Sequence, residues 1–587
     1  MISPEFSYNT PLALDDQWYL ALDIGSGLSA CLLNRNSEKI YPIYWETQAI
    51  DRENPGSDSM TFRVPCEVDW QERSDGFRRK LKNIKSYLNL AIPYIRIAQD
   101  NASEVSQVPI PLVQLSNKQT VFLGKFQRAL QLLLSTLTPE PQKQFKGLIL
   151  PKLYRCHAEE LDLKTLYWIL ERLTGVIVGF SSQATEAYRF NVEKAILDAN
   201  LVKGSEQIFW LEDPIAIFLS QYHSGKIPLS GGSAFILDAG STTTEMAIVE
   251  LPDQIENLDY TDFICHSWAY GGEALDLDIV CQLLLNSPTG KQLQSQVFLD
   301  QDLILPQPGF PDLQNRYRLR QKLQSQPVGV ALLEAATSLK VILSQQQQYT
   351  LEIEEYYWEL NSTDLERLVL VPFINQLNAE LNQVIVKAGI SSIGINQAIC
   401  RGENGNWLSL NRWLRQKFPN AILLKKPHQE PEIVNQQFDQ IQVAIGLANL
   451  PLYPQVLDRS RHQYRDYFLL KELLKAFDGR SLSLNEIMQV LESRGINTRS
   501  CQSRIVAILD GQLPLGLVPQ EPEIVLIHPA SQRTPDYQRL SPGKFFTQDE
   551  NNLYSLNAEQ ALEVRQYLKQ LFSDFPQYLE EPAIVLL

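Results

Sequence analysis

Two apolar segments of this chain end in the same short turn, Leu20–Gly27 near the start and Phe235–Thr243 near the middle. Each turn places an aspartate at the end of a predicted strand, followed by glycine and hydroxyl residues. Backbone N–H groups in such a turn can face an anion without adding charge or bulk. Apolar residues resume after each turn, so we expect two β-hairpins, over about 17–34 and 235–251. The repeated hairpin predicts a core built from two related halves.

Length and charge narrow the class of protein. At 587 residues the chain is too long for one hydrophobic core, so we expect several domains. The net charge of −16 argues against a general nucleic-acid coat or an anionic membrane surface as partner, because either would repel the protein. A small local basic patch is compatible with that charge.

Cysteine usage and the N-terminus indicate the compartment. The seven cysteines are scattered and form no Cys-x-x-Cys pair, which predicts reduced thiols rather than disulfides or a zinc site. The N-terminus has no basic segment followed by an apolar one, so no secretory signal is predicted. No apolar run approaches the ~20 residues needed to cross a bilayer. We therefore expect a cytoplasmic protein that does not associate with membranes.

Hydrophobic periodicity predicts further elements around the two hairpins. We expect strands at 175–180, 207–211 and 398–400, and helices at 77–91, 126–137, 158–173, 330–344 and 362–388, the last capped by Ser362. Region 285–328 is rich in Gln, Pro and Leu with little periodicity, which predicts an insertion or a mobile loop. Composition shifts near 452–455, where we place a domain boundary.

The paired turns offer the groups that a nucleoside triphosphate needs. Asp23 and Asp238 arrive from different hairpins and can hold magnesium through water, because Mg²⁺ keeps much of its hydration shell. The hydroxyls of Ser26, Thr242 and Thr243 add hydrogen-bond donors for phosphate oxygens. Attack of water on a γ-phosphate then depends mainly on positioning and charge stabilisation. The turns together predict a site for ATP and Mg²⁺.

The order of motifs along 17–455 resembles that of the actin-like ATPases, with the nearest likeness to the heat shock protein 70 (DnaK-type) chaperones and similarity to MreB- and FtsA-type bacterial actins. Segments 23–26 and 238–245 resemble the two phosphate motifs of that family, and 270–276 resembles the segment after the second. The connecting, adenosine and closing motifs are matched, in chain order, by 183–187, 212–217, 337–344, 398–402 and 443–448.

This resemblance implies an α/β fold in which an actin-like ATPase domain of duplicated ribonuclease H-like lobes precedes a mainly helical C-terminal region. The expected division is a tail at 1–16, lobe I at 17–230, lobe II at 231–455 and the C-terminal region at 456–587. The resemblance also implies a chaperone-like ATPase whose lobe closure controls a protein client or cofactor protein. It implies catalytic roles for Asp23, Asp213 and Asp238, metal roles for Asp23, Asp238 and Glu245, and cofactor contacts by Gly25, Ser26, Gly27, Gly240, Ser241, Thr242, Thr243, Gly271, Gly272, Lys340, Ser344 and Gly402.

The sequence departs from the family pattern mainly around the adenosine. Ser241 and Thr242 replace two glycines of the second phosphate turn, and Arg401 stands where the first adenosine-motif glycine is expected. Thr337 and Val341 replace the glutamate and the adenine-stacking arginine of the chaperones. An alternative interpretation is therefore a scaffold for protein interaction that keeps the fold without hydrolysing ATP.

Individual charged residues also leave alternatives open. Glu245 can be a solvated charge at a strand end instead of a metal ligand, and Lys340 can be a surface charge on a helix. The lysine that contacts phosphate has three candidates, Lys80, Lys82 and Lys85.

The region after 455 is expected to be short and helical, with helices at 467–477, 484–493, 498–509 and 557–572. It lacks the alternating strands of the β-sandwich with which the chaperones bind peptides. Ser483 and Glu486 have capping-box spacing, and Gly495 is placed to end a helix, so the first three helices could form a winged helix.

A C-terminal winged helix would have two candidate roles. Arg494, Arg499 and Arg504 give its helices a mild positive bias, which would suit an ATP-sensing regulator that binds DNA. The low density of basic residues around them favours contact with protein instead.

Overall fold

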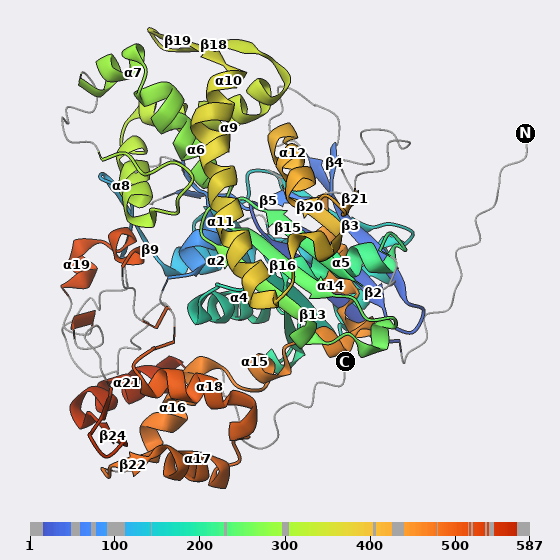
Figure 1. Cartoon of the computed structure of the whole chain (residues 1–587), viewed down its shortest axis with the longest axis vertical. Coiled ribbons are helices and arrows are strands. Elements are labelled where there is room, and N and C mark those ends of the chain that lie inside the picture. The colour runs from blue at the N-terminus through green and yellow to red at the C-terminus, as the bar shows by residue number, and fades with distance from the viewer. Residues whose placement is uncertain are drawn as a thin grey trace, which may run out of the picture.

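The computed structural model describes residues 16–48, 59–71, 78–90, 112–142, 144–227, 232–295, 304–402, 407–424, 440–477, 479–514, 516–517, 521–533, 537–538 and 545–571. The chain is a mixed α/β protein, as the sequence predicts, with several mixed sheets and many helices. Figure 1 shows the sheets in the middle of the molecule, with helices α16, α17 and α18 at the bottom of the view.

The first large sheet has the strand order β12-β3-β2-β1-β13-β14. Strands β1, β2 and β3 are antiparallel neighbours, whereas β13 lies parallel to β1 and β14 parallel to β13. All but one residue of β1 and all of β2 are buried, as expected of strands covered on both faces. The strands are β1 (Trp18–Ile24), β2 (Gly27–Asn34), β3 (Lys39–Gln48), β12 (Leu153–Ala158), β13 (Gly175–Phe180) and β14 (Ile208–Glu212), with β4 (Ser59–Thr61) and β5 (Val64–Pro65) at the side.

The second sheet repeats this arrangement in the order β17-β16-β15-β20-β21. Its first three strands are antiparallel neighbours, and β20 and β21 continue in parallel from β15. The two predicted hairpins, β1–β2 and β15–β16, are confirmed, and each lies inside its sheet next to a parallel strand. The strands are β15 (Ser233–Ala239), β16 (Thr244–Glu250), β17 (Phe263–Trp268), β20 (Ile395–Arg401) and β21 (Ile422–Leu424).

Two helices fill the space between the sheets, α5 (Asp213–His223) and α14 (Gln442–Ala448). Their apolar residues form one core with the facing sides of both sheets. The two helix backbones meet at Gly446, where a Cβ would lie only 1.7 Å from the carbonyl oxygen of Ala216. Only glycine fits at that crossing, so α5 and α14 pack as closely as backbones can.

Further elements cover the outer faces of the two sheets (Figure 1). Beside the first sheet lie β6 (Val68–Gln71), β7 (Arg78–Leu81), α1 (Ile84–Leu88), β8 (Leu112–Ser116), β9 (Gln119–Phe122), α2 (Gly124–Leu134), β10 (Gln144–Phe145), β11 (Leu148–Ile149), α3 (Leu163–Leu170) and α4 (Glu186–Asp198). Beside the second lie α6 (Gly272–Ile279), α7 (Pro288–Leu293), α8 (Leu313–Leu323), α9 (Pro327–Gln345), β18 (Gln348–Ile353), β19 (Tyr356–Asn361), α10 (Ser362–Leu365), α11 (Val371–Ala388) and α12 (Leu408–Lys417).

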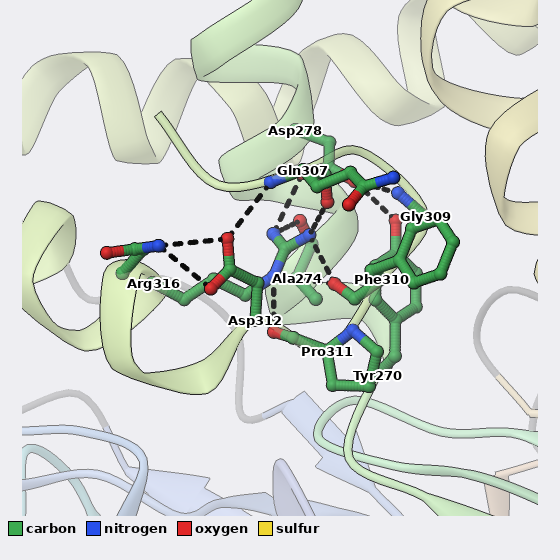
Figure 2. A network of polar contacts seen from close by, with 10 residues as sticks. Tyr270, Ala274, Asp278, Gln307, Gly309, Phe310, Pro311, Asp312 and Arg316 are labelled. Atoms are coloured by element: carbon green, nitrogen blue, oxygen red, sulfur yellow. Dashed lines mark hydrogen bonds and ion pairs between the residues drawn. The ribbon is translucent and has the colours of Figure 1, made fainter. Parts of the chain in front are cut away.

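Region 285–328 differs from the mobile loop that its composition suggested, because its described part contains helices α7 and α8. A buried ion pair anchors it, with Arg316 Nη1 2.8 Å from Asp278 Oδ1 (Figure 2). The same guanidinium donates to four backbone carbonyls, and Asp278 accepts from the hydroxyl of Tyr270 and the N–H of Gly309. These long-range contacts leave no local periodicity for sequence analysis to detect.

Two other local expectations also differ from the structure. The side chain of Asn361, not Ser362, caps the helix that follows, by accepting the N–H of Asp364 at 2.7 Å. Within the helix expected at 77–91, residues 78–81 instead form strand β7, because they pair with β6, and only the short helix α1 remains.

The C-terminal region contains the three predicted helices almost as drawn, α16 (Asp466–Ala476), α17 (Leu484–Ser493) and α18 (Thr498–Leu509), followed by α21 (Ala558–Leu571). The capping box of Ser483 and Glu486 is confirmed. Sequence analysis missed a small antiparallel sheet, whose strands β22 (Leu482–Ser483), β24 (Leu553–Leu556) and β23 (Phe546–Gln548) are too short to show alternation.

This region is docked on helix α4 of the first half. Ala187 and Phe190 of α4 belong to the same buried core as α16, α17 and α18. Arg465, at the start of α16, forms an ion pair with the buried Glu193 of α4. In the short helix α15 (Arg459–Gln463), His462 Nε2 accepts the backbone N–H of Trp210 in β14 at 2.9 Å. The C-terminal region is therefore continuous with the first half.

The cysteines and the apolar helix α9 bear on redox state and on membrane association. All seven cysteines are free, as predicted. Among the described residues one helix, α9, is by length and composition apolar enough to cross a membrane, with 33% of that window buried. A single helix of this kind is weak evidence, because core helices of soluble proteins pass the same test.

We predict that Arg316→Met lowers the free energy of unfolding by about 3–5 kcal/mol, because it leaves the carboxylate of Asp278 buried without its cation. The matched control is Arg367→Met, which breaks an ion pair of 3.0 Å whose side chains are 67% and 39% exposed. Its cost should stay below about 1 kcal/mol. Urea denaturation measures both changes, and equal losses would contradict the anchoring role of Arg316.

A second prediction concerns pH. Burial, together with the charges of Arg189 and Arg465, lowers the pKa of His462 from 6.5 to about 3. Below pH 6.5 His462 therefore becomes protonated in the unfolded chain but stays neutral in the folded chain. Stability is lost as pH falls from 6.5 toward 3. The upper limit of this slope is about 1.4 kcal/mol per pH unit.

His462→Gln keeps a hydrogen-bond acceptor but does not titrate. We expect its free energy of unfolding, measured in urea between pH 7 and pH 5, to fall less steeply than that of the wild type. Parallel pH profiles for the two proteins would show that His462 contributes nothing to acid sensitivity.

Candidate functional site

The two turns meet at a cavity of about 250 Å³ that both halves of the molecule line. Its wall is made by the turn after β1, the turn after β15, the start of α5, the end of β20 and the start of α14. Helix α1 and the loop before β5 complete it. The lining residues are Asp23, Gly25, Arg63, Lys85, Asp213, Ile217, Asp238, Gly240, Ser241, Thr242, Thr243, Glu245, Cys400, Arg401, Gly402, Gln440, Gln442 and Val443.

Four of these residues are carboxylates, Asp23, Asp213, Asp238 and Glu245. The antiparallel register of β15 and β16 places Asp238 directly opposite Glu245. Like charges in a cross-strand pair destabilise a sheet, so this pairing has a cost that packing does not explain. Such an arrangement is typical of a site that binds a cation or exchanges a proton.

Lys85 of α1 is a cation that lies among these carboxylates and is largely shielded from solvent. Its Nζ lies 4.0 Å from Asp213 Oδ2, and its side chain is 11% exposed. Burial opposes the ammonium, but the surrounding groups, Tyr188, Asp213, Glu245 and Asp23, outweigh it and raise the pKa of Lys85. Lys85 therefore stays charged and offsets part of the negative charge of the cavity.

The other two lysine candidates lie elsewhere. Lys80 pairs with Glu67 at 3.5 Å, and Lys82 pairs with Glu334 at 3.4 Å, with both lysine side chains about half exposed. Of the three lysines only Lys85 lines the cavity. Sequence analysis offered three candidate lysines that included Lys85, but it could not distinguish among them.

Two carboxylate oxygens at this site have no hydrogen-bond partner among the described residues, Asp213 Oδ1 and Glu245 Oε2. Thr243 donates to the other oxygen of Glu245 at 3.1 Å. Burial raises the pKa of Asp213 to about 7 in spite of Lys85, with Asp23 and Asp238 adding to the effect. Burial also raises the pKa of Glu245, and the nearby charge of Asp213 raises it further. The cluster is thus short of positive charge.

The lack of positive charge beside these carboxylates raises the question of whether a metal ion suits the site. Within the described part of the chain no group of three or more His, Cys, Asp or Glu side chains is arranged to hold a metal ion directly. An ion held by Asp23, Asp238 and Glu245 would have to keep most of its water shell, as Mg²⁺ does. Orphaned buried carboxylate oxygens and an excess of negative charge are consistent with such an ion.

Two arginines bring further positive charge that sequence analysis did not assign to a ligand. Arg401, the last residue of β20, lies beside Asp238 in the parallel register. Arg63 packs on the first turn, since a Cβ added at Gly27 would lie 2.5 Å from its Cγ. No local pattern marks Arg63, because it reaches the turn from the loop between β4 and β5.

Two predicted glycines shape the second turn from behind. The N–H of Gly272 donates to the carbonyl of Gly240 at 2.9 Å. A Cβ at Gly271 would lie 2.7 Å from the backbone of Ser241. These glycines support the turn from the start of α6 and are not among the residues that line the cavity.

The structure thus brings together most of the predicted site, but not all of it. Lys340 lies away from the cavity wall and pairs with Asp276 at 3.0 Å, while the hydroxyl of Ser344 donates to the carbonyl of Val341. The predicted residues that line the cavity are Asp23, Gly25, Asp213, Asp238, Gly240, Ser241, Thr242, Thr243, Glu245 and Gly402, and those outside the lining are Ser26, Gly27, Gly271, Gly272, Lys340 and Ser344.

Several lining residues were not predicted as ligand contacts, namely Arg63, Ile217, Cys400, Arg401, Gln440, Gln442 and Val443. Most follow from the topology, since they lie at the ends of elements that converge on the cavity. The motif around 443–448 was the available signal for the last of them. No protein-family model matches this chain, and no curated protein matches it either.

Gly402 offers a test of the wall beside Asp238. Its φ is +92°, and a Cβ there would lie 2.3 Å from the Ala239 carbonyl and 2.7 Å from Asp238 Oδ1. Gly225 has a similar φ of +70° but nothing within 4 Å of its Cβ position. Gly225→Ala should therefore cost about 1 kcal/mol of stability through backbone strain alone.

Gly402→Ala adds a clash to that strain, and we expect it to cost at least about 2 kcal/mol more than the control. Thermal denaturation of the two variants gives the comparison. Equal melting temperatures would mean that the backbone does not approach Asp238 as closely as described.

Proposed function

We propose that this chain has the actin-like ATPase fold and that it binds and hydrolyses Mg-ATP in the cavity between its two halves. One observation carries the proposal: the hairpins of two sheets of similar strand order bring their turns, four carboxylates and a lysine to one cavity. In both sheets three antiparallel strands, β3-β2-β1 and β17-β16-β15, are followed by two parallel ones, which is the order expected of a ribonuclease H-like lobe. The first sheet carries β12 as a further antiparallel strand.

The roles follow from the positions of the side chains. The hydroxyl of Thr242 and the ammonium of Lys85 would bind phosphate oxygens. The N–H groups of Gly25 and Gly240 instead shape the two turns, because they donate to the carbonyls of Gly27 and Thr243. Asp23, Asp238 and Glu245 would hold the hydrated Mg²⁺. Bound Mg²⁺ would supply charge neutralisation at the phosphates during transfer.

Asp213 is the group best placed to act on the attacking water. It begins helix α5, and its Oδ1 has no hydrogen-bond partner among the described residues. In the proposed step the water oxygen bonds to the γ-phosphorus, the bond from that phosphorus to the bridging oxygen breaks, and the Asp213 carboxylate takes the proton. A pKa of about 7 matches such a proton acceptor to neutral conditions.

We further propose that the C-terminal region, with the element order of a winged helix, transmits the state of the cavity to a protein partner in the manner of a chaperone-related ATPase. It contacts the first half through α4 and β14, and β14 runs directly into Asp213. The described residues of this region contain no β-sandwich, so peptide clamping as in the heat shock protein 70 chaperones is not part of the proposal.

A role in DNA binding receives less support, because two of the three arginines that suggested it are engaged in contacts within the protein. Arg504 pairs with Asp466 and donates to the carbonyls of Ser460 and Tyr464. Arg494 donates to the carbonyl of Lys475 at 3.0 Å. Arg499 remains as an exposed arginine of α18, so that this helix keeps only one of the three for an external partner.

Arg401 favours a second candidate function, a scaffold that keeps the fold for protein interaction without turnover. Its guanidinium shares the cavity with Asp238 and offers a cation where a magnesium-binding carboxylate would otherwise be uncompensated. A protein that satisfies Asp238 internally has less need of a metal ion.

Calorimetric titration of Mg-ATP into the whole protein separates these functions. We expect wild-type binding, weakened at least about tenfold in Asp23→Ala and Asp238→Ala because each removes a carboxylate that would hold the hydrated metal. The control is Asp253→Ala, an exposed carboxylate outside the cavity, which should bind as the wild type does.

Release of inorganic phosphate from ATP then tests turnover in the same samples. Absence of heat and of any thermal shift at millimolar ATP would reject the ATPase and leave the scaffold. Binding without phosphate release would also favour the scaffold.

A further inference from the structure

A second cavity, of about 240 Å³, lies on the outer side of helix α2, apart from the site just described. It is enclosed by the end of β9, the first turns of α2, the β10–β11 turn and the C-terminal part of α4. The residues that line it are Phe122, Gly124, Lys125, Gln127, Arg128, Gln131, Phe145, Lys146, Lys194 and Asp198.

Positive charge dominates this pocket in an otherwise acidic protein. Four lining residues are cations and one is a carboxylate, Asp198, which pairs with Lys194 at 3.5 Å. In a chain of net charge −16, such a concentration of cations is opposite in sign to the whole. A concave basic surface raises the local concentration of small anions.

Lys125, one of the four cations, is held in place by the fold. The Nζ of Lys125 lies 3.6 Å from the centre of the ring of Trp70, which is 2% exposed, so a cation–π contact fixes its position. The side chain of Gln131 donates to the carbonyl of Asp198 at 2.8 Å and ties α2 to α4 beneath the pocket. One wall of the site is thus preorganised, while Arg128 and Lys146 complete it from the surface.

An independent observation also points to a ligand. Gln127 lines the pocket and is 7% exposed, yet its Nε2 has no hydrogen-bond partner among the described residues. A buried amide donor without an acceptor costs about 1–3 kcal/mol. An oxygen-rich anion is the class of ligand that would give this amide an acceptor and satisfy the surrounding cations at the same time.

We propose that this pocket binds a small phosphate-bearing ligand. Phosphate oxygens would accept from Lys125, Arg128 and Gln127, and the start of α2 presents N–H groups on the same side. Phe122, which is 45% exposed, and Phe145 flank the cations and offer apolar contact to the organic part of the ligand. The inference is independent of the ATPase function proposed above.

Calorimetric titration of pyrophosphate into the whole protein tests the site. The double variant Arg128→Ala/Lys146→Ala removes two exposed cations of the pocket, and we expect at least about tenfold weaker binding. The matched control Lys164→Ala/Lys291→Ala removes two exposed cations elsewhere and should bind as the wild type does. Equal affinity in the wild type and the pocket variant would overturn the proposal.

Gln127→Leu gives a second arm that does not change the charge. It removes the unpartnered amide, so we expect unchanged or higher thermal stability together with weaker pyrophosphate binding. Undiminished binding in this variant would show that Gln127 does not face the ligand. Citrate, as a carboxylate probe, should bind more weakly than pyrophosphate, and tighter citrate binding would overturn the assignment to phosphate.

Discussion

The crossing of α5 and α14 is the contact on which the rest of the molecule depends. A Cβ at Gly446 would lie 1.7 Å from the Ala216 carbonyl, so the two helices occupy a single thin layer between the sheets. Because that layer is shared, the first turn, the second turn and the start of α5 reach the same point in space. The cavity and its charges are thus a consequence of helix packing, and a side chain at Gly446 would separate the groups that form it.

The like charges that folding brings together at the cavity lower the stability of the folded chain. Asp238 faces Glu245 across a hairpin and Asp213 lies in the same wall. The four carboxylates of the cavity exceed its three cations, Arg63, Lys85 and Arg401. Buried charges without full compensation lower stability, and they persist where function requires them. Two turns with hydrogen-bond donors add to this picture, since they attract anions while the carboxylates attract cations. A ligand that carries both a cation and an anion, such as a metal–phosphate complex, would compensate the carboxylates and give the donors of the turns an acceptor.

The sequence was sufficient for the features that depend on short spacing. The repeated turn predicted both central hairpins, and the capping box at Ser483 predicted the start of α17. It was insufficient where long-range contacts decide the structure. Arg316 ties region 285–328 to Asp278 and Ala274 of the preceding helix α6, and Arg63 reaches the first turn from a loop without any recognisable pattern. The adenosine side was predicted by motif order alone, and Lys340 there pairs with Asp276 instead of lining the cavity.

The hydrogen bond between His462 and Trp210 has a consequence beyond the acid sensitivity of folding. Strand β14 is the last strand of the first sheet, and His462 of α15 accepts one of its backbone N–H groups. An uncovered edge of this kind recruits strands from other molecules. The C-terminal region therefore also serves as a cover that keeps the first sheet from growing, and a chain ending before Asp458 would expose that edge to self-association.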